Sequence, residues 1–189
     1  MRSLVPIPRA RSLSALLFAL ALAGVLLSKG CAKTYPNRTP LGERFPTVVG
    51  KSLEEETVRL PDDILGEPAI LLVGYAQGTQ FDIDRWFLGL LQADVSARIF
   101  EIPTIPGLVP TPVSKWIDDG MRAGIPPQDW AAVVTLYRSN ATPVAKLTGN
   151  QNKRNTRALV LDDKGTIIWF SDLGYSASQA LEIKSLLER

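Results

Sequence analysis

The sequence has 189 residues, of which 21 are Lys or Arg and 19 are Asp or Glu, with one cysteine and no histidine. Without histidine, the chain cannot build a Ser-His-Asp or Cys-His nucleophile, a histidine-containing zinc site or the commonest general base near neutral pH. With one cysteine it can form no internal disulfide and carry out no dithiol exchange. We therefore expect no catalytic residues, no metal and no cofactor.

The first 30 residues have the pattern of a targeting segment. Three arginines precede an apolar run from Leu13 to Leu27, and Ser28-Lys29-Gly30 lead to the single cysteine, Cys31. The run of about 15 residues is short for a membrane-spanning helix, which needs about 20. This order resembles the signal peptide of a bacterial lipoprotein, which implies lipidation at Cys31 as the first residue of the mature protein. An ordinary secretory signal cut nearby and an uncleaved N-terminal anchor helix are the alternatives.

Lipidation would place the protein at a membrane surface. Stable anchoring needs at least two acyl chains, such as palmitate, and a triacylated Cys31 meets that requirement. The resemblance implies a location in the cell envelope, on the periplasmic or otherwise extracytoplasmic side. In a double-membrane bacterium, Ala32 after the cysteine is similar to a sorting signal for the outer membrane.

The charge of the remaining chain argues against nucleic-acid binding. Residues 1–30 hold four basic residues and no acidic ones, so the rest has 17 basic and 19 acidic residues. The basic character belongs to the targeting segment, and no Lys/Arg stripe follows it. Residues 31–43 are polar and rich in turn formers, which predicts a tether. One domain over residues 44–189 is long enough to form a substantial core.

The first half of this domain predicts a β-α-β unit. Alternation over residues 57–60 indicates a short strand, and the continuous apolar run Ile70 to Val73 indicates a strand covered on both faces. Apolar residues between Phe81 and Leu91 follow helical spacing, which predicts a helix over about residues 82–93. Residues 98–103 predict the next strand.

The second half predicts a helix, a strand, a hairpin and a closing helix. Four prolines interrupt residues 103–112, and helical spacing resumes from Val113 to Met121. Residues 131–137 indicate a buried strand. Strands over 156–161 and 166–170 flank the turn sequence Asp162-Asp163-Lys164-Gly165, and apolar residues up to Leu187 predict the final helix.

This element order resembles the thioredoxin-like fold with the extra N-terminal strands of peroxiredoxin-type relatives. The matching pieces are Phe45-Pro46 before Val49-Gly50, the strand Ile70 to Tyr75, and the hairpin at residues 162–165. The resemblance implies an α/β domain over residues 44–189, with a central mixed sheet flanked by helices. Phe45-Pro46 and Trp86 also give a weaker similarity to the mitochondrial ATP synthase assembly factor family, a precedent for protein binding by such a domain.

The chain departs from that family at its redox residues. Thioredoxin-like enzymes carry a reactive cysteine or a Cys-x-x-Cys pair in the loop after the central strand, where the helix N-terminus stabilises the thiolate. Here that loop is Gln77-Gly78-Thr79-Gln80. The proline, usually cis, that precedes the hairpin in those enzymes is also missing, because the sequence there is Arg154-Asn155-Thr156. The resemblance therefore implies a redox-inactive member.

The same two loops form the candidate binding site. The loop after the central strand would offer free backbone N–H groups at a helix N-terminus, and a later polar stretch would approach the same edge with two positive charges. Such a site suits a peptide backbone or a small anion. The alternative is that Thr79 caps the helix and the later stretch is a solvated loop. The candidate residues are Gln77, Gly78, Thr79, Gln80, Asn152, Lys153 and Arg154.

The aromatic and proline-rich segments give further expectations. Trp86 and Trp116 lie in helical patterns and are expected in the core, whereas Trp130, after two prolines, is expected to be exposed. The proline-rich loop with Leu108 and Val109 either presents an apolar ridge or packs on the domain. The adjacent acidic pairs predict turns and caps rather than a metal site.

The leading hypothesis is a membrane-anchored, non-catalytic domain that binds an unidentified protein or peptide of the cell envelope. Two alternatives stay open. One is a lipoprotein that binds a small anion or metabolite through the helix N-terminus, Lys153 and Arg154. The other is an enzyme whose chemistry needs neither histidine nor cysteine, for example one that uses Thr79 with Lys153.

Overall fold

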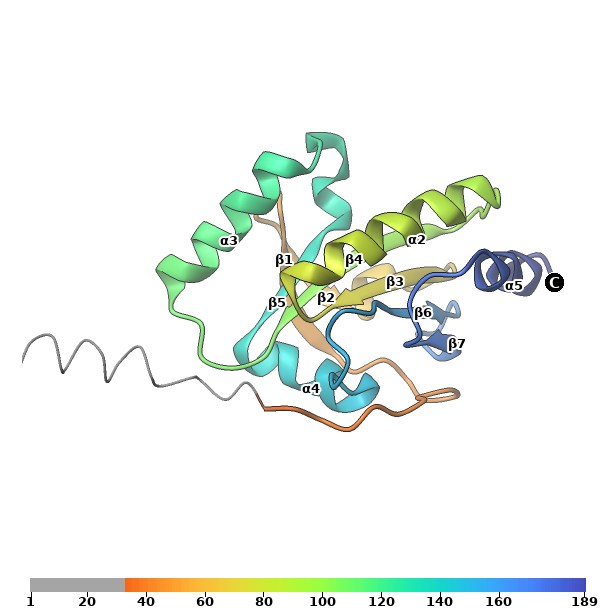
Figure 1. The fold of residues 1–189 in the computed structure, drawn as a ribbon, viewed down its shortest axis with the longest axis horizontal. Coiled ribbons are helices and arrows are strands. Elements are labelled where there is room, and N and C mark those ends of the chain that lie inside the picture. Colours follow the sequence, from red (N-terminus) through yellow and green to blue (C-terminus); the bar gives the residue numbers. More distant parts are fainter. Residues whose placement is uncertain (1–32) are drawn as a thin grey trace, which may run out of the picture. The chain divides into compact units, whose positions relative to one another are not determined.

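The computed structural model describes residues 33–189. Its strands are β1 (Val48–Ser52), β2 (Thr57–Leu60), β3 (Ala69–Gly74), β4 (Arg98–Ile105), β5 (Val134–Tyr137), β6 (Arg157–Leu161) and β7 (Ile167–Ser171). Its α-helices are α2 (Gln80–Gln92), α3 (Thr111–Gly124), α4 (Arg138–Thr148) and α5 (Ala177–Leu187). Figure 1 shows the strands as one sheet with helices around it. Cys31 and the targeting segment lie outside the described residues.

The sheet is mixed, as the sequence predicts. Its strand order is β2-β1-β5-β4-β3-β6-β7. Strands β3, β4 and β5 are parallel to one another, whereas β6 runs antiparallel to β3 and β7 antiparallel to β6. Every residue of β3 is buried, which explains its continuous apolar sequence. The predicted N-terminal strand extension corresponds to β1 and β2, which join the sheet through β5.

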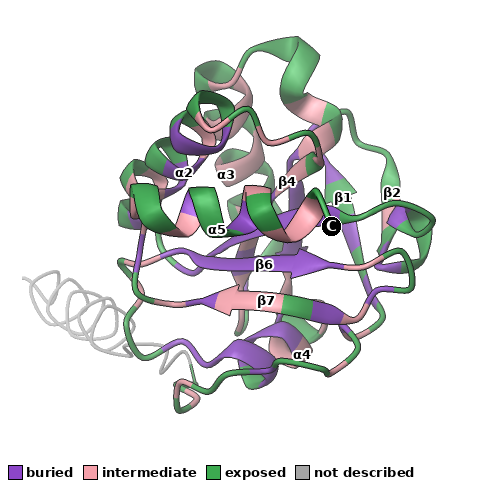
Figure 2. Ribbon diagram, turned by 90° about the vertical axis from the view of Figure 1, so that its right-hand side faces the viewer, coloured by how far each residue is buried: buried purple, intermediate pink, exposed green. Residues whose placement is uncertain are grey.

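The helices cover the two faces of the sheet unequally. Helices α2 and α5 lie on one face and α4 on the other (Figure 2). On the α2 face, Ile83, Trp86 and Leu90 recur at helical spacing and are buried against residues of β3 and β6. The rings of Trp169 and Tyr175 meet Trp86 edge-on, with centroids 5.9 and 5.5 Å away. Trp86 is therefore a core residue, as predicted.

Helix α4 was not predicted from the sequence. Its residues include Ser139, Asn140, Thr142 and Pro143, which are weak helix formers or helix breakers. The helix is stabilised by burial instead, because Ala141, Val144, Ala145 and Leu147 pack under the sheet in the larger core cluster. The predicted strand over residues 131–137 is also shorter, since residues 127–132 form a 3₁₀ helix and only 134–137 are strand.

The expectations for two tryptophans are wrong. Trp116 is 76 % exposed, and Trp130 is half-buried with its ring nitrogen donating to the carbonyl of Ile125 at 2.9 Å. The helical spacing around Trp116 is real, but Val113 and Trp116 are exposed, and Ile117 and Met121 are only half-buried. None of the residues of α3 is fully buried.

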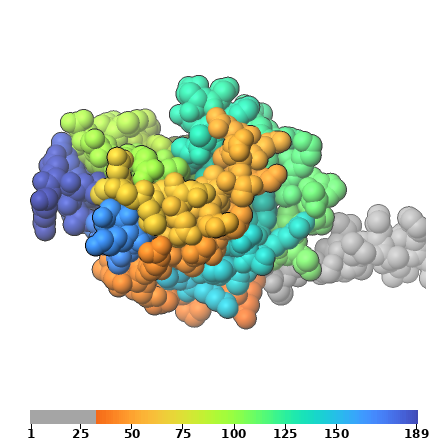
Figure 3. Space-filling view, turned by 180° about the vertical axis from the view of Figure 1, so that it is seen from behind, coloured from red at the N-terminus to blue at the C-terminus, as the bar shows by residue number. Residues whose placement is uncertain are grey.

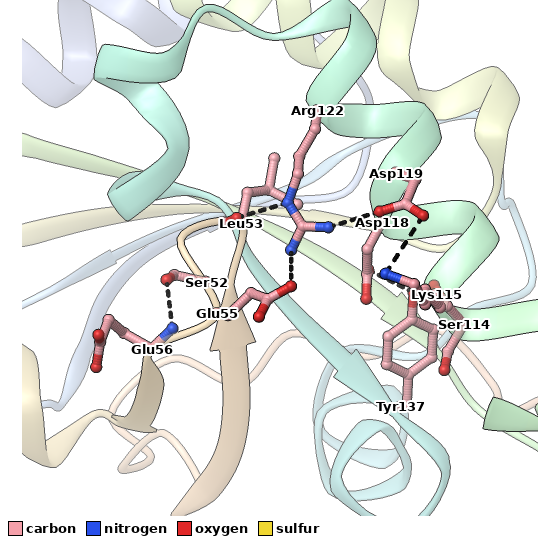
Figure 4. A network of polar contacts seen from close by, with 10 residues as sticks. All are labelled: Ser52, Leu53, Glu55, Glu56, Ser114, Lys115, Asp118, Asp119, Arg122 and Tyr137. Atoms are coloured by element: carbon pink, nitrogen blue, oxygen red, sulfur yellow. Dashed lines mark hydrogen bonds and ion pairs between the residues drawn. The ribbon is translucent and has the colours of Figure 1, made fainter. Parts of the chain in front are cut away.

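Polar contacts attach α3 to the rest of the domain (Figure 4). Arg122 donates through Nε to the carbonyl of Leu53 at 2.7 Å, and its Nη2 pairs with Glu55 at 3.4 Å. The hydroxyl of Tyr137 lies 2.7 Å from Asp118 Oδ1, and burial is the first cause of the raised pKa of that hydroxyl. Hydrophobic periodicity alone could not show that this helix uses its polar side for packing.

The described part of the predicted tether packs against the domain. Tyr35 and Asn150 exchange two hydrogen bonds, from Tyr35 N to Asn150 Oδ1 at 2.7 Å and from Asn150 N to the carbonyl of Tyr35 at 3.1 Å. Further along, Gly42 N donates to the carbonyl of Ile167 at 2.9 Å. Seen from behind, this orange segment runs along the lower surface (Figure 3). The compact unit therefore includes residues before 44.

Candidate functional site

The candidate site lies at the end of the sheet where β3, β4 and β5 terminate, which we call the C-terminal edge. The turn into α2 follows β3, and the proline-rich loop follows β4. Strand β6 begins at this edge because it is antiparallel to β3, with Arg157 opposite Val73. Figure 1 shows these loops together on the left side of the domain. In α/β sheets, ligands bind at such edges because the loops converge there.

Thr79 joins the two predicted loops. Its side chain is fully buried, and its hydroxyl donates to the carbonyl of Lys153 at 2.6 Å while accepting from Ala76 N at 3.3 Å. The structure thus brings the turn before α2 against the stretch before β6, as expected. Since the hydroxyl of Thr79 is used within the domain, Thr79 positions the loops and leaves the contact surface to its neighbours.

The other candidate residues differ in how accessible they are. Gln77, Gly78, Asn152 and Arg154 are exposed, and Lys153 is half-exposed. A Cβ atom added to Gly78 would meet nothing, so the fold itself does not require glycine there. Arg154 N donates to Asn152 Oδ1 at 3.4 Å, which shapes the second loop. These exposed residues could contact a partner without displacing any part of the domain.

Asp82 in the first turn of α2 holds two other segments in place. Its carboxylate accepts from Thr156 N and from Tyr175 N, both at 2.9 Å. A carboxylate at this position is favourable to the helix dipole and partly neutralises the positive end of α2. The N-terminus of α2 is therefore less able to attract an external anion than its backbone alone suggests.

A buried carboxyl beside Gln80 was not anticipated from the sequence. Glu101 on β4 is 4 % exposed, and its Oε2 lies 3.4 Å from Gln80 Nε2, which also donates to Asp84 Oδ1 at 3.0 Å. Burial raises the pKa of Glu101 to about 7, the hydrogen bond from Gln80 opposes this, and the negative charge of Asp84 adds to it. A charged residue between the apolar Phe100 and Ile102 is the signal that could have identified it.

A buried arginine supports the same edge from the opposite face of the sheet. Arg157 is fully buried with its guanidinium 5.4 Å from the centroid of Tyr75, and it donates to the carbonyl of Asn155 at 2.8 Å and to Asn37 Oδ1 at 3.0 Å. Burial lowers the pKa of Arg157. Arg157 therefore links the N-terminal segment to the loop before β6, a role the sequence alone did not suggest.

Within residues 33–189 the structure holds no group of three carboxylate, histidine or cysteine side chains able to bind a metal ion. In the same part of the chain, no helix has the length and hydropathy needed to cross a bilayer.

Neither family models nor curated proteins match the sequence. Solved structures do match its fold. A thiol:disulfide interchange protein from Bacteroides sp. has a TM-score of 0.53 at 15 % identity, covering 79 % of this chain and 91 % of that one. A SCO1/SenC family lipoprotein from Bacillus anthracis also has 0.53, at 10 % identity over 82 % of this chain and 100 % of that one. The exposed lipoprotein thioredoxin Etrx1 from Streptococcus pneumoniae has 0.50 at 11 % identity, covering 75 % and 100 %.

The fold is thioredoxin-like. This confirms the fold resemblance seen in the sequence. Gln77 to Gln80 lie between β3 and the first turn of α2, in the loop after the central strand. The peptide bond of Leu60-Pro61 is the one cis bond in the described residues, and it lies away from this edge, before η1 (Asp62–Ile64). The residue immediately before β6 is Thr156, whose N–H donates to Asp82 as described above.

Proposed function

We propose that this protein is a membrane-anchored, non-catalytic thioredoxin-like domain that binds a protein or peptide at the cell envelope. The observation that carries the proposal is the ordered polar surface at the C-terminal edge of the sheet. The hydrogen bond from Thr79 to Lys153 orders two polar loops there, and exposed amide and cationic side chains surround it, without a thiol in either loop. Such a surface offers hydrogen bonds to a polypeptide and no group for thiol exchange.

The sequence and the fold neighbours support the envelope location. Cys31 follows a lipoprotein-type signal, and two of the similar solved structures are described as lipoproteins. A metal-transfer role, suggested by the copper bound in the Arabidopsis thaliana ScoI structure, is less well supported. Copper sites favour thiolate and imidazole ligands, whereas this sequence has no histidine and only one cysteine.

Binding of a small anion is also less well supported. Lys153 and Arg154 would attract an anion, but the carboxylate of Asp82 already occupies the first turn of α2. Enzyme chemistry through Thr79 has less support than anion binding. The hydroxyl of Thr79 is buried and donates its hydrogen bond to a backbone carbonyl rather than to a side chain that could act as a general base.

Site-specific photo-crosslinking in cells would test the proposal. A photoreactive amino acid at Gln77 should give a defined adduct, whereas the same group at Glu67 should not. Glu67 is a matched control because it is also exposed but lies before β3, at the opposite edge of the sheet. Equal adducts from both positions, or none from Gln77, would argue against binding at this edge, and disulfide turnover by the mature protein would contradict the non-catalytic part.

A further inference from the structure

Three exposed apolar side chains project from the C-terminal edge. Phe81 in the first turn of α2 is 80 % exposed, Leu108 in the loop after β4 is 99 % exposed, and Leu173 after β7 is 79 % exposed. Leu173 belongs to this edge because β7 ends opposite the start of β6, where Ser171 pairs with Ala158. The two alternatives for the proline-rich loop, packing on the domain and presenting an apolar side chain, both occur. Val109 packs on the domain and is 9 % exposed, whereas Leu108 is exposed to solvent.

Cations accompany these apolar side chains. Lys33, Lys153 and Arg154 come from the same edge, and within residues 33–189 none of them forms an ion pair. The neighbouring carboxylate of Asp82 is hydrogen bonded to two backbone N–H groups. Exposed apolar side chains with unpaired cations suit the interface of a bilayer that contains anionic lipids.

The position of Lys33, at the start of the described chain, indicates that a membrane covers this edge. The carbonyl of Lys33 accepts from Asn150 Nδ2 at 3.3 Å, and Asn150, which is fully buried, lies in the loop before β6. Cys31 precedes Lys33 by two residues, and two residues span at most about 7 Å. A lipid on Cys31 would thus attach close to this edge.

We propose that the C-terminal edge of the sheet lies on the membrane, with Phe81, Leu108 and Leu173 at the level of the lipid headgroups and Lys33, Lys153 and Arg154 facing anionic lipids. This inference rests on the membrane attachment in the proposed function. It implies that the candidate site operates at the bilayer surface, so a partner contacting Gln77 would itself be bound to the membrane.

Spin labelling of the full chain in vesicles tests this orientation. The lipoprotein is purified from membranes and reconstituted into vesicles of phosphatidylethanolamine and phosphatidylglycerol, with a label at Phe81→Cys, Leu108→Cys or Leu173→Cys. The control is Leu91→Cys, which is 68 % exposed but lies in the last turn of α2, at the opposite edge. Acylated Cys31 takes up no label, and mass spectrometry of the parent protein verifies this; where Cys31 is free, Cys31→Ser supplies the background.

We expect the labels at the three edge positions to become less accessible to a water-soluble nickel chelate and more accessible to oxygen, which concentrates in the bilayer. The label at Leu91→Cys should stay accessible to the chelate. Replacing phosphatidylglycerol by phosphatidylcholine should reduce the shift, as should a variant with Lys153→Glu and Arg154→Glu. Protein that floats with the vesicles while all four labels stay equally accessible to the chelate would overturn this orientation and leave the anchor intact. Failure to float would overturn both, and spin–spin broadening at Leu108→Cys would assign the edge to a second copy.

Discussion

The buried carboxyl of Glu101 should make the stability of this domain depend on pH in a direction that a single substitution can isolate. Its pKa is raised from 4.5 to about 7 in the folded state, mainly by burial. The folded protein therefore binds a proton more tightly than the unfolded chain does. The resulting stabilisation is fully present below pH 4.5 and is lost as the pH rises through 7. From pH 5 to pH 8 the free energy of unfolding should fall by about 2.5 kcal/mol on account of this group.

Glu101→Gln should remove this dependence, because the amide keeps the shape of the side chain without titrating. Urea unfolding of residues 33–189, followed by tryptophan fluorescence at several pH values, gives the free energy of unfolding for both proteins. Other carboxylates contribute equally to the two profiles, so their difference reports Glu101. Asp84→Asn is the matched control, since it removes only the neighbouring charge and should lower the pKa of Glu101 while keeping the slope. Parallel profiles for the parent and Glu101→Gln would refute the reasoning.

Three further sets of substitutions test the contacts of the site, of the N-terminal segment and of the core. Thr79→Val should destabilise the domain by about 1–3 kcal/mol, because the part-buried carbonyl of Lys153 loses its donor, whereas Thr79→Ser should not; urea unfolding compares them. Asn150→Ala should release the N-terminal segment, so that the amide of Tyr35 exchanges hydrogen roughly tenfold faster for each 1.4 kcal/mol lost. Trp86→Ala should cost about 3–5 kcal/mol, whereas Trp116→Ala should change the free energy of unfolding by less than about 0.5 kcal/mol; similar losses would contradict the exposure of Trp116.

The central part of the fold could be predicted because its sequence signals agree at every level. The apolar run of β3, the helical spacing of α2 and the turn Asp162-Asp163-Lys164-Gly165 each determine one element. In that turn, Asp162 Oδ1 accepts from the N–H groups of Lys164 and Thr166, a contact that local sequence alone specifies. Helix α4 lacks such agreement, because its weak helix formers are stabilised by burial that only the complete sheet provides.

Part of the site could be predicted for the same reason. The two loops follow from the positions of their strands, and the topology of the sheet brings them together. The contacts that fix them join residues far apart in the chain, as when the hydroxyl of Thr79 donates to the carbonyl of Lys153. No local pattern encodes such a contact. The sequence therefore indicated that these two loops meet but not which of their side chains are used within the domain and which are exposed.

The tryptophans show why hydrophobic spacing and burial are separate questions. Trp86 and Trp116 both lie in amphipathic patterns, and both were expected in the core. Helix α2 turns its apolar side to the sheet, whereas α3 is attached through Arg122 and Asp118 on its polar side (Figure 4). An arginine that donates to a backbone carbonyl, together with a tyrosine hydroxyl on a carboxylate, can hold a helix whose apolar residues are not fully buried. The exposure of Trp116 thus depends on which partners of α3 the rest of the domain provides. These partners, such as Leu53 and Tyr137, lie far from α3 or outside it in the sequence, so the sequence of α3 alone could not show how the helix packs.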